Sequence, residues 1–299
     1  MFEFHKMHGL GNYFLFFDEL MQDFSRLKQP QVIRTLCDAR FGVGADGLVF
    51  VMPPVENHHH CRMQVFNADG SEAEMCGNAI RGVAHWYKKH HLGFEPILVE
   101  TRSGLRQVYS SEVREGVCMY RVEMGVVNFD LTTTGELVPE PSRKPLTWDE
   151  EPLSLHYANV GNPHAVLFMD TPLTTDAQIK LGAWLETHPN HPRRINVEFV
   201  EILSPHEVNV TVWERGCGMT HACGTGGTAV AASGIKAGKL QSPVTVHMPG
   251  GDLILEQGEN GVMFMTGPVQ EVADGHLAPS FVDVLFGRPQ RRLMPLTGK

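Results

Sequence analysis

The sequence contains no uninterrupted apolar run of the roughly eighteen residues that a membrane-spanning helix requires, so no such helix is expected. Charge is also scarce, since only 20% of the 299 residues are charged, with 25 Lys and Arg against 34 Asp and Glu. Because nucleic-acid binding needs clustered Lys and Arg against the phosphates, a scattered net charge of −9 argues against a nucleic-acid partner. Residues 288–292 form a locally basic stretch, which is typical of a solvated terminus.

Export features are missing as well. The first nine residues include Glu3 and Lys6 where a secretory signal would carry an apolar core, so no signal peptide is expected. The six cysteines follow no regular spacing and stand at positions 37, 61, 76, 118, 217 and 223. In a long chain without an export signal, this pattern favours reduced thiols, no structural disulfides and a cytoplasmic location.

Apolar residues make up 42% of the chain, which is enough for real hydrophobic cores, and the length favours two domains. Short runs rich in Val, Ile, Phe and Leu alternate with turn residues, as in 47–54 and 243–251, and predict mainly antiparallel strands. Helices are expected at about 31–40, 78–90, 176–187 and 226–238. The last of these consists almost entirely of small residues, so it makes sense only as a helix packed inside other structure.

The sequence also repeats at long period. Matching positions occur in the same order, 150, 147 and 142 residues apart: Gly11-Asn12 with Gly161-Asn162, Cys76 with Cys223, and Met124-Gly125 with Thr266-Gly267. This order predicts two similar halves. The join is expected near 132–152, a stretch with four prolines and little apolar periodicity, as in a linker.

Cys76 and Cys223 each stand directly before a glycine-rich segment that opens a predicted helix. The free amides of a helix N-terminus stabilise a thiolate, and they also bind carboxylates. Two such ends facing one cleft would hold a carboxylate between them, with a thiol on either face of its α carbon. That arrangement suits a two-base racemase, in which one thiolate removes the α proton and the opposite thiol delivers another.

Other interpretations of the cysteines stay open. Cys37, Cys61 and Cys118 are expected to be small buried hydrophobic residues. Cys217 lies six residues before Cys223 in a predicted turn and is a possible redox partner for it. A non-catalytic ligand-binding protein or a two-cysteine redox sensor is therefore the alternative from a different class.

Polar residues near the two cysteines suit an amino-acid head group. Arg215 offers a planar fork for a carboxylate and Glu214 offers a charge for an ammonium group. Residues 67–71 have the composition of an ordinary turn as well as of a binding loop. Asn162, His164 and Asn196 are ambiguous alone, and a capping or core role is the favoured explanation for them.

No cofactor or metal site is expected from the remaining motifs. Residues 58–60 are three adjacent histidines, but neighbouring side chains diverge in an extended segment and no further ligands complete a tetrahedron, so a solvated loop is favoured. Residues 42–47 follow a helix and lead into a strand, the reverse of the dinucleotide-binding order. No lysine pattern distinctive of a pyridoxal site stands out.

Taken together, these segments resemble one known family, the diaminopimelate epimerases. The matching segments run in order along the chain: 6–12, 44–47, 67–78, 161–164, 196–197, 214–216, 222–226 and 265–268. The longest of them, from Asn67 to Asn78, is specific enough to make a chance match negligible. Proline racemases have a similar architecture but typically carry histidine where this chain has Asn78, so a two-cysteine racemase of proline or histidine is the alternative within the same chemistry.

The resemblance implies an α+β fold of two pseudo-symmetric, mainly antiparallel barrel-like domains, each around a central helix. The first would comprise 1–128 with about 268–299 and carry Cys76, and the second would comprise 129–267 and carry Cys223. It also implies a cofactor-independent isomerase that interconverts LL- and meso-diaminopimelate in lysine and peptidoglycan synthesis, as a cytoplasmic homodimer.

In that family, residues matching Cys76 and Cys223 are the acid/base pair, and His164 and Glu214 support proton transfer. The resemblance further implies a set of substrate contacts: Asn12, Asn67, Gly77, Asn78, Asn162, Asn196, Glu214, Arg215, Gly224 and Thr225. Two positions depart from the pattern. Tyr13 stands where the family usually has aspartate, and Gly47 replaces a glutamine that some members use near the substrate. Neither the histidine cluster nor the chain after about 280 has a counterpart.

Overall fold

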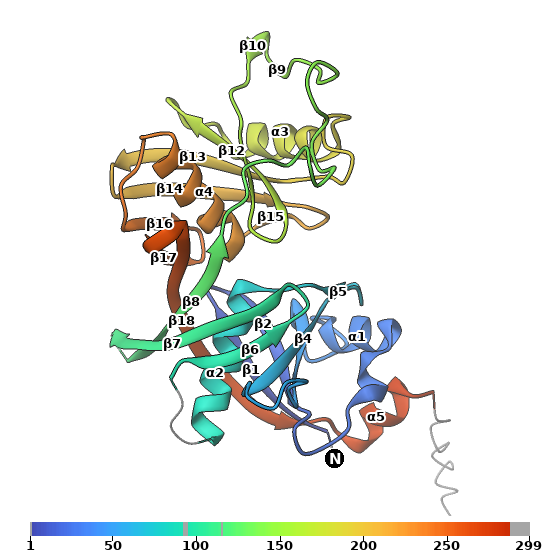
Figure 1. Cartoon of the computed structure of the whole chain (residues 1–299). Coiled ribbons are helices and arrows are strands. Elements are labelled where there is room, and N and C mark those ends of the chain that lie inside the picture. Colours follow the sequence, from blue (N-terminus) through green and yellow to red (C-terminus); the bar gives the residue numbers. More distant parts are fainter. Residues whose placement is uncertain (1, 92–94, 115, 288–299) are drawn as a thin grey trace, which may run out of the picture.

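The computed structural model describes residues 2–91, 95–114 and 116–287. Turn residues break the chain into short strands of alternating burial, and most of these strands join one 16-stranded sheet. The sheet curls into two stacked halves, with β8 (Val117–Val126) and β18 (Val262–His276) running between them (Figure 1). The basic stretch at 288–292 and the end of the first predicted domain lie outside the described residues.

The first half is a closed barrel. Its strands pair in the order β1-β2-β3-β4-β6-β7-β8-β18, and β18 pairs back to β1. The strands not yet given are β1 (Glu3–Gly9), β2 (Asn12–Asp18), β3 (Gly47–Met52), β4 (Cys61–Asn67), β5 (Glu72–Ala73), β6 (Ile97–Thr101) and β7 (Gly104–Arg114). The helices of this half are η1 (Ser25–Lys28), α1 (Pro30–Cys37), α2 (Gly77–His90) and α5 (Pro279–Leu285).

The second half repeats this plan. Its strands are β11 (His156–Asn159), β12 (Pro163–Met169), β13 (Asn196–Ser204), β14 (Glu207–Glu214), β15 (Gly218–Thr220), β16 (Val244–Met248) and β17 (Gly251–Gln257). Its helices are α3 (Thr175–Thr187), α4 (Gly224–Lys236) and η2 (Glu259–Gly261). Parallel pairs recur at equivalent places, with β2–β3 matched by β12–β13 and β4–β6 by β14–β16. The predicted duplication is therefore confirmed by the topology.

Each barrel encloses one helix. Ala79, Ile80 and Val83 bury one face of α2, whereas α4 is buried over most of its length by small residues such as Ala229 and Ala231. Small side chains suit α4 because strands surround it and leave room for little more than the backbone. The prediction of an internal helix there is confirmed, although it begins at Gly224 rather than at 226.

The stretch predicted as a linker is more structured than expected. It contains the small hairpin of β9 (Thr147–Trp148) and β10 (Glu151–Pro152), and Leu137 is buried in a cluster with β12, β13 and α3. The apolar residues of this stretch are too widely spaced to show a period, but they still pack on the second half. Among the residues after 280 that the structure describes, Phe281 and Leu285 of α5 pack against the α1 side of the first barrel.

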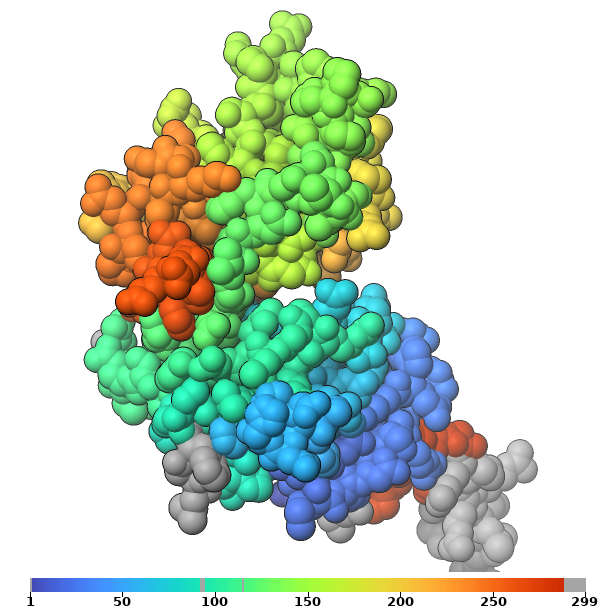
Figure 2. Space-filling view, in the orientation of Figure 1, coloured from blue at the N-terminus to red at the C-terminus, as the bar shows by residue number. Residues whose placement is uncertain are grey.

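In the space-filling view the surface narrows where the two halves meet (Figure 2). Among the described residues, no helix combines the length and apolar character that crossing a membrane would take.

Candidate active site

The two helices meet end to end at the junction of the halves. Cys76 is the residue before α2 and Cys223 the residue before α4, and both have extended backbone angles. A Cβ placed on Gly77 would lie 3.4 Å from the Gly224 Cα, so the two helix N-termini approach closely. A Cβ on Gly224 would lie 2.9 Å from the sulfur of Met265, which flanks this contact from β18. Two sets of free amides with partial positive charge therefore converge beside two thiols.

Asparagine side chains surround the first thiol. The Cys76 Sγ lies 3.9 Å from Asn12 Oδ1, which also accepts a 3.1 Å hydrogen bond from Asn78 Nδ2. Asn78 Nδ2 additionally donates to the Ala222 carbonyl at 3.3 Å and so ties α2 to the second half. Burial raises the pKa of the Cys76 thiol and Glu214 adds to that rise, whereas the amides of Ala79 and Asn78 and then Arg81 oppose it.

The second thiol accepts a hydrogen bond from its own helix. The Gly226 amide donates to Cys223 Sγ at 3.4 Å, and the Thr225 hydroxyl lies 3.5 Å from the same sulfur. Burial first, and then the carboxylates of Glu214 and Glu198, raise the pKa of Cys223 well above its ordinary value. The two sulfurs thus occupy similar backbone positions in different electrostatic surroundings.

Glu214 stands beside the second thiol. Its Oε1 accepts a 2.6 Å hydrogen bond from the Thr220 hydroxyl. Burial raises the pKa of Glu214, while hydrogen bonds from Thr220 and from Cys223 oppose the rise. A carboxylate in this position suits a role in proton transfer or in binding an ammonium group.

His164 is fully buried between two oxygen atoms. Its Nδ1 lies 2.6 Å from Glu198 Oε1 and its Nε2 lies 2.9 Å from Asn162 Oδ1. Glu198 is equally buried and lies against α4, because a Cβ on Gly226 would stand 2.9 Å from its Oε1. Sequence reasoning stopped at Asn196 and missed Glu198. A charged residue inside the apolar strand 196–200 was the available signal.

Asn67, Asn196 and Arg215 are expected substrate contacts, and in this structure their side chains form hydrogen bonds within the protein. Asn196 Nδ2 donates to the Pro163 carbonyl at 2.8 Å, and its Oδ1 accepts from the Arg215 amide at 2.9 Å. The Arg215 guanidinium donates to the Arg193 carbonyl at 3.3 Å on the exposed side. Asn67 donates to Ser71 Oγ at 3.0 Å within its own turn. Asn196 thereby fixes the loop that carries Arg215, whereas Asn67 and Arg215 remain exposed.

Loops of the two halves face one another next to these residues. Cys217 lies in the turn between β14 and β15, and its thiol is exposed. Burial raises the pKa of Cys217, and Glu214 and then Asp69 of the first half raise it further. Acidic residues of both halves therefore act on the thiol of this turn.

The remaining cysteines and histidines lie elsewhere. All six cysteines are free thiols, and Cys37 and Cys61 are buried with pKa values raised by burial to about 12. In the histidine cluster, His59 Nδ1 pairs with Glu100 at 2.8 Å and His60 Nδ1 accepts from the Leu98 amide at 2.8 Å. The expectation of a solvated loop holds for the exposed His58 only, since the other two are bound to the neighbouring hairpin.

Tyr13 and Gly47, the two positions that depart from the family pattern, both lie within the described structure. The Tyr13 ring is 37% exposed and lies 4.8 Å from the His8 ring, and the Tyr13 amide donates to Asp46 Oδ2 at 2.8 Å. A Cβ on Gly47 would stand 2.2 Å from the Phe66 carbonyl oxygen. This backbone therefore has no room for a glutamine unless β3 and β4 shift.

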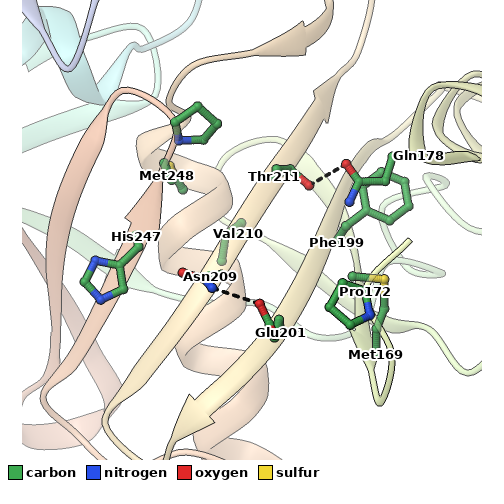
Figure 3. A pocket seen from close by; sticks show the side chains of 11 residues that line it. Met169, Pro172, Gln178, Phe199, Glu201, Asn209, Val210, Thr211, His247 and Met248 are labelled. Carbon is green, nitrogen blue, oxygen red and sulfur yellow. Dashed lines mark hydrogen bonds between the residues drawn. The ribbon is translucent and has the colours of Figure 1, made fainter. Parts of the chain in front are cut away.

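A separate pocket of about 320 Å³ lies on the second half (Figure 3), and the sulfur of Met248, one of its lining residues, accepts from the Cys223 amide at 3.4 Å. Its polar side chains already bind each other, because Thr211 donates to Gln178 at 2.9 Å and Asn209 donates to Glu201 at 2.8 Å. It therefore offers few unpaired polar groups to a ligand, and the converging helix ends remain the better candidate site.

The fold is that of the two-barrel racemases and epimerases. A probable proline racemase from Agrobacterium radiobacter aligns with a TM-score of 0.67 at 14% identity, covering 93% of each chain. A hydroxyproline epimerase from Agrobacterium vitis aligns with a TM-score of 0.66 at 14% identity, covering 92% of this chain and 90% of that one. At this level of identity the likeness shows the fold alone.

Closer relatives define the family. The diaminopimelate epimerase family model matches residues 4–129 and 156–272. The diaminopimelate epimerase of Carboxydothermus hydrogenoformans is 42% identical over 286 residues, covering 91% of this chain and 98% of that protein. The diaminopimelate epimerase of Methanothermobacter thermautotrophicus is 41% identical over 285 residues, covering 93% of this chain and 99% of that protein. The chain belongs to the diaminopimelate epimerase family and is an isomerase.

Proposed function

We propose that this protein interconverts LL- and meso-diaminopimelate, with Cys76 and Cys223 as its two acid/base groups. The observation that carries the proposal is the convergence of two helix N-termini, each preceded by a cysteine, where the Gly77 and Gly224 backbones meet. Free amides on both sides suit a substrate carboxylate, and the thiols flank the place where its α carbon would lie. Family membership supplies the identity of the substrate.

In this scheme one thiolate removes the α proton and the opposite thiol gives its proton to the other face. The amides that follow each cysteine, at Gly77, Asn78, Gly224 and Thr225, would hold the carboxylate as negative charge develops. Asn12, Asn162 and Glu214 would contact the substrate around the two thiols. His164 would support proton transfer through Asn162, its 2.9 Å neighbour. The scheme needs no cofactor.

Diaminopimelate carries an amino-acid group at each end, so a second set of contacts is required. We assign this distal role to Asn67, Asn196 and Arg215. The positions of these residues support this assignment. Asn67 and Arg215 present exposed polar groups, and Asn196 fixes the Arg215 backbone. Arg215 would exchange its bond to the Arg193 carbonyl for a bidentate bond to the distal carboxylate.

The proposal also covers the cellular role, the location and the oligomeric state of the protein. The reaction would serve lysine and peptidoglycan precursor synthesis in the cytoplasm, without a nucleic-acid or membrane partner, and the protein would act as a homodimer. Light scattering of the purified protein tests the last point, because a molar mass of about 33.3 kDa, that of a single chain, would contradict it.

The domain division is likewise a proposal: 1–128 with about 268–299, and 129–267. It is supported by β18, which pairs with β17 up to Thr266 and with β1 from Gln270 onward. The unmatched gap between the two segments of the family model, 130–155, lies next to the proposed boundary.

The test of function is incubation of the protein with LL-diaminopimelate in deuterated water. Epimerisation places a solvent deuteron on the inverted α carbon, which mass spectrometry and proton NMR detect in the meso product. Proline and histidine, supplied separately, are the comparison substrates. If diaminopimelate acquires no deuterium while proline does, the substrate assignment is wrong; if neither exchanges, the racemase chemistry is wrong.

A further inference from the structure

Glu186, the second-last residue of α3, is a carboxylate in a doubly unfavourable place. Only 5% of the residue is exposed. It also lies in the last turn of the helix, where the free carbonyl groups carry partial negative charge. Neither burial nor this end of a helix favours an anion. Because violations of this kind concentrate at functional sites, the groups that Glu186 binds point to its role.

Three hydrogen-bond donors converge on this carboxylate. Its Oε2 accepts from Trp213 Nε1 at 2.7 Å, and its Oε1 accepts from the Gly216 amide at 2.9 Å and from Arg194 Nη1 at 3.3 Å. Trp213 precedes the residue pair 214–215 in the chain and Gly216 follows it. Glu186 therefore clamps both ends of the turn that carries the two charged site residues.

The packing of α3 brings the indole within reach of this carboxylate. A Cβ on Gly182, one turn before Glu186, would lie 2.7 Å from the Trp213 side chain, so the helix surface is flat where the ring lies. Trp213 also packs against the apolar cluster of the second half. The indole is thus held by its ring and by its N–H together, which fixes the strand end next to the turn.

The two charged residues of the turn depend on different supports. Glu214 belongs to the pairing of β14 with β15 and accepts a 2.6 Å hydrogen bond from Thr220. Arg215 lies just past β14, and its amide donates to Asn196 Oδ1 at 2.9 Å. Its next residue along the chain is the one that Glu186 binds. Loss of the Glu186 carboxylate should therefore release Arg215 more than Glu214.

We infer that Glu186 is a positioning residue that fixes the 214–217 turn, so that Arg215 meets the distal carboxylate of a two-ended amino-acid substrate. This inference rests on the proposed function and adds how the chain favours a substrate with a second carboxylate. Glu186 acts through Trp213 and Gly216 rather than by contact with the substrate. A turn that is ordered before binding loses less conformational freedom when the guanidinium forms its bidentate bond.

Steady-state kinetics of Glu186→Gln test this role. The amide keeps the size of the side chain but replaces one acceptor oxygen by a donor, which then faces an N–H group. We expect KM for LL-diaminopimelate to rise by about tenfold or more, the effect of one hydrogen bond to a charged group, and kcat to change less. An unchanged KM in the folded variant would overturn the inference.

The route through Arg215 is tested by a double-mutant cycle. In an Arg215→Ala background, Glu186→Gln should raise KM no further, because the group that it positions is already missing. If the two substitutions instead multiply their effects on KM, Glu186 acts by another route and the inference is wrong.

Limited digestion of the whole protein with trypsin measures the turn without turnover. Cleavage after the exposed Arg215 requires the turn to open, and we expect Glu186→Gln to speed it by about tenfold. Cleavage after Arg102, in the exposed turn between β6 and β7, should keep its rate. Mass spectrometry distinguishes the two sites. No acceleration, or equal acceleration at both sites, would contradict a local effect on the 214–217 turn.

Glu100→Gln is the matched control. Glu100 accepts hydrogen bonds from the amides of Val55 and Glu56 at 2.8 Å and pairs with His59, so the same exchange loosens a loop that carries no candidate site residue. It should leave both KM and the cleavage after Arg215 unchanged. A rise in KM equal to that of Glu186→Gln would show a general effect of losing a buried carboxylate and would overturn the inference.

A second variant covers the case in which Glu186→Gln does not fold. Trp213→Phe removes one donor to Glu186 and keeps an aromatic ring, so it should raise KM and speed the cleavage after Arg215, whereas neither change would contradict the clamp. An unmodified chain that places no deuterium on diaminopimelate would contradict the proposed function. The digestion would then still support or overturn the hold of Glu186 on the turn.

Discussion

At the scale of single residues, the two cysteines show how one backbone position serves two electrostatic states. Each thiol precedes a helix and lies near free amides, which favour the thiolate. Burial opposes this at both, and so does Glu214, while Glu198 raises the pKa of Cys223 further and Arg81 lowers that of Cys76. The backbone favours a thiolate at both positions, and the charged side chains around them differ.

Removing either sulfur tests the two-base scheme. We expect Cys76→Ala and Cys223→Ala each to lower the epimerisation rate by about 10²–10⁴-fold or more, the range that a positioned acid or base contributes. Circular dichroism should be unchanged, because each loss is one small side chain. The rates of LL-to-meso and meso-to-LL conversion are measured by chiral chromatography.

Cys217→Ala is the control for these variants, because Cys217 is exposed and lies in a turn. It should retain full activity. A Cys217→Ala variant that lost turnover together with Cys223→Ala would instead favour a redox pair, and full turnover in either Cys76→Ala or Cys223→Ala would eliminate the two-base mechanism.

His247 gives a pH-dependent contribution to stability. Hydrogen bonds to Asp252 and then to Glu207 raise the pKa of His247 above its ordinary 6.5. A raised folded-state pKa means that the stabilisation is fully present below the unfolded value and is lost as pH rises through the folded pKa. The pair is partly exposed, so His247→Gln should lower the free energy of unfolding by less than about 1 kcal/mol near pH 5.5.

By about pH 9 the same substitution should make no difference, since the imidazole is then neutral in both states. Urea denaturation at each of the two pH values measures the change in the free energy of unfolding. Asp252→Asn is the companion variant and should show the same trend. A loss of equal size at both pH values would mean that His247 acts through packing rather than through charge.

At the scale of elements, the two enclosed helices are fitted to their barrels by small residues. Gly82 on α2 passes the Phe16 ring so closely that an added Cβ would lie 2.4 Å from the ring. Gly227 on α4 faces β16 and β17, where an added Cβ would lie 3.3 Å from Met248 Cε and 3.5 Å from Leu253 Cδ1. Since interiors are close-packed, these contacts fix how deep each helix sits.

Gly82→Ala is therefore expected to destabilise the protein. Overpacking costs about 1–3 kcal/mol and exceeds the helix propensity that alanine gains, so we expect a net loss of about 1 kcal/mol or more in the free energy of unfolding. Urea denaturation measures the change. A double-mutant cycle with Phe16→Leu identifies the cause, because a smaller side chain opposite should relieve the loss. Additive effects of the two substitutions would show that Phe16 is not the group that resists the added methyl.

At the scale of the whole molecule, β8 and β18 belong to both halves. Strand β18 pairs with β8 from Val262 to Val269, with β17 near its start and with β1 from Gln270 onward. Met263, Met265 and Val269 of this strand are buried in the core shared by the two barrels. Neither barrel is closed without it, although the sequence places it after every other strand.

A chain that ends at residue 261 should consequently fail to fold cooperatively, in both halves at once. The loss of β18 leaves β1, β8 and β17 with unpaired edges and opens both cores to water. Differential scanning calorimetry and NMR chemical-shift dispersion measure this outcome. A chain that ends at residue 287 keeps every described element and is the control. A sharp unfolding transition in the shorter chain would show that one half closes by itself.

Much of the site was predictable from local pattern, because a cysteine before a glycine-rich helix start carries its own chemistry. Cys76, Cys223 and the two helices they precede are where the sequence placed them, within two residues. Arg81 was not recognised, since a charged residue in an amphipathic helix has the pattern of a solvated one, and Glu198 was missed although it stands inside an apolar strand. Burial is a property of the surroundings, which residues far along the chain supply.

The duplicated plan, the two thiols and the class of chemistry can be read from the sequence, because repeats, helix starts and motifs are encoded in short segments. Folding is needed to bring the Gly77 and Gly224 backbones together, to make room at Gly9 and Gly267 for the buried Arg81 guanidinium, and to place Glu198 beside the Gly226 position next to Cys223. Each of these contacts joins segments that are distant in sequence. Electrostatic energies depend on distance and burial in space, and the order of residues along the chain fixes neither.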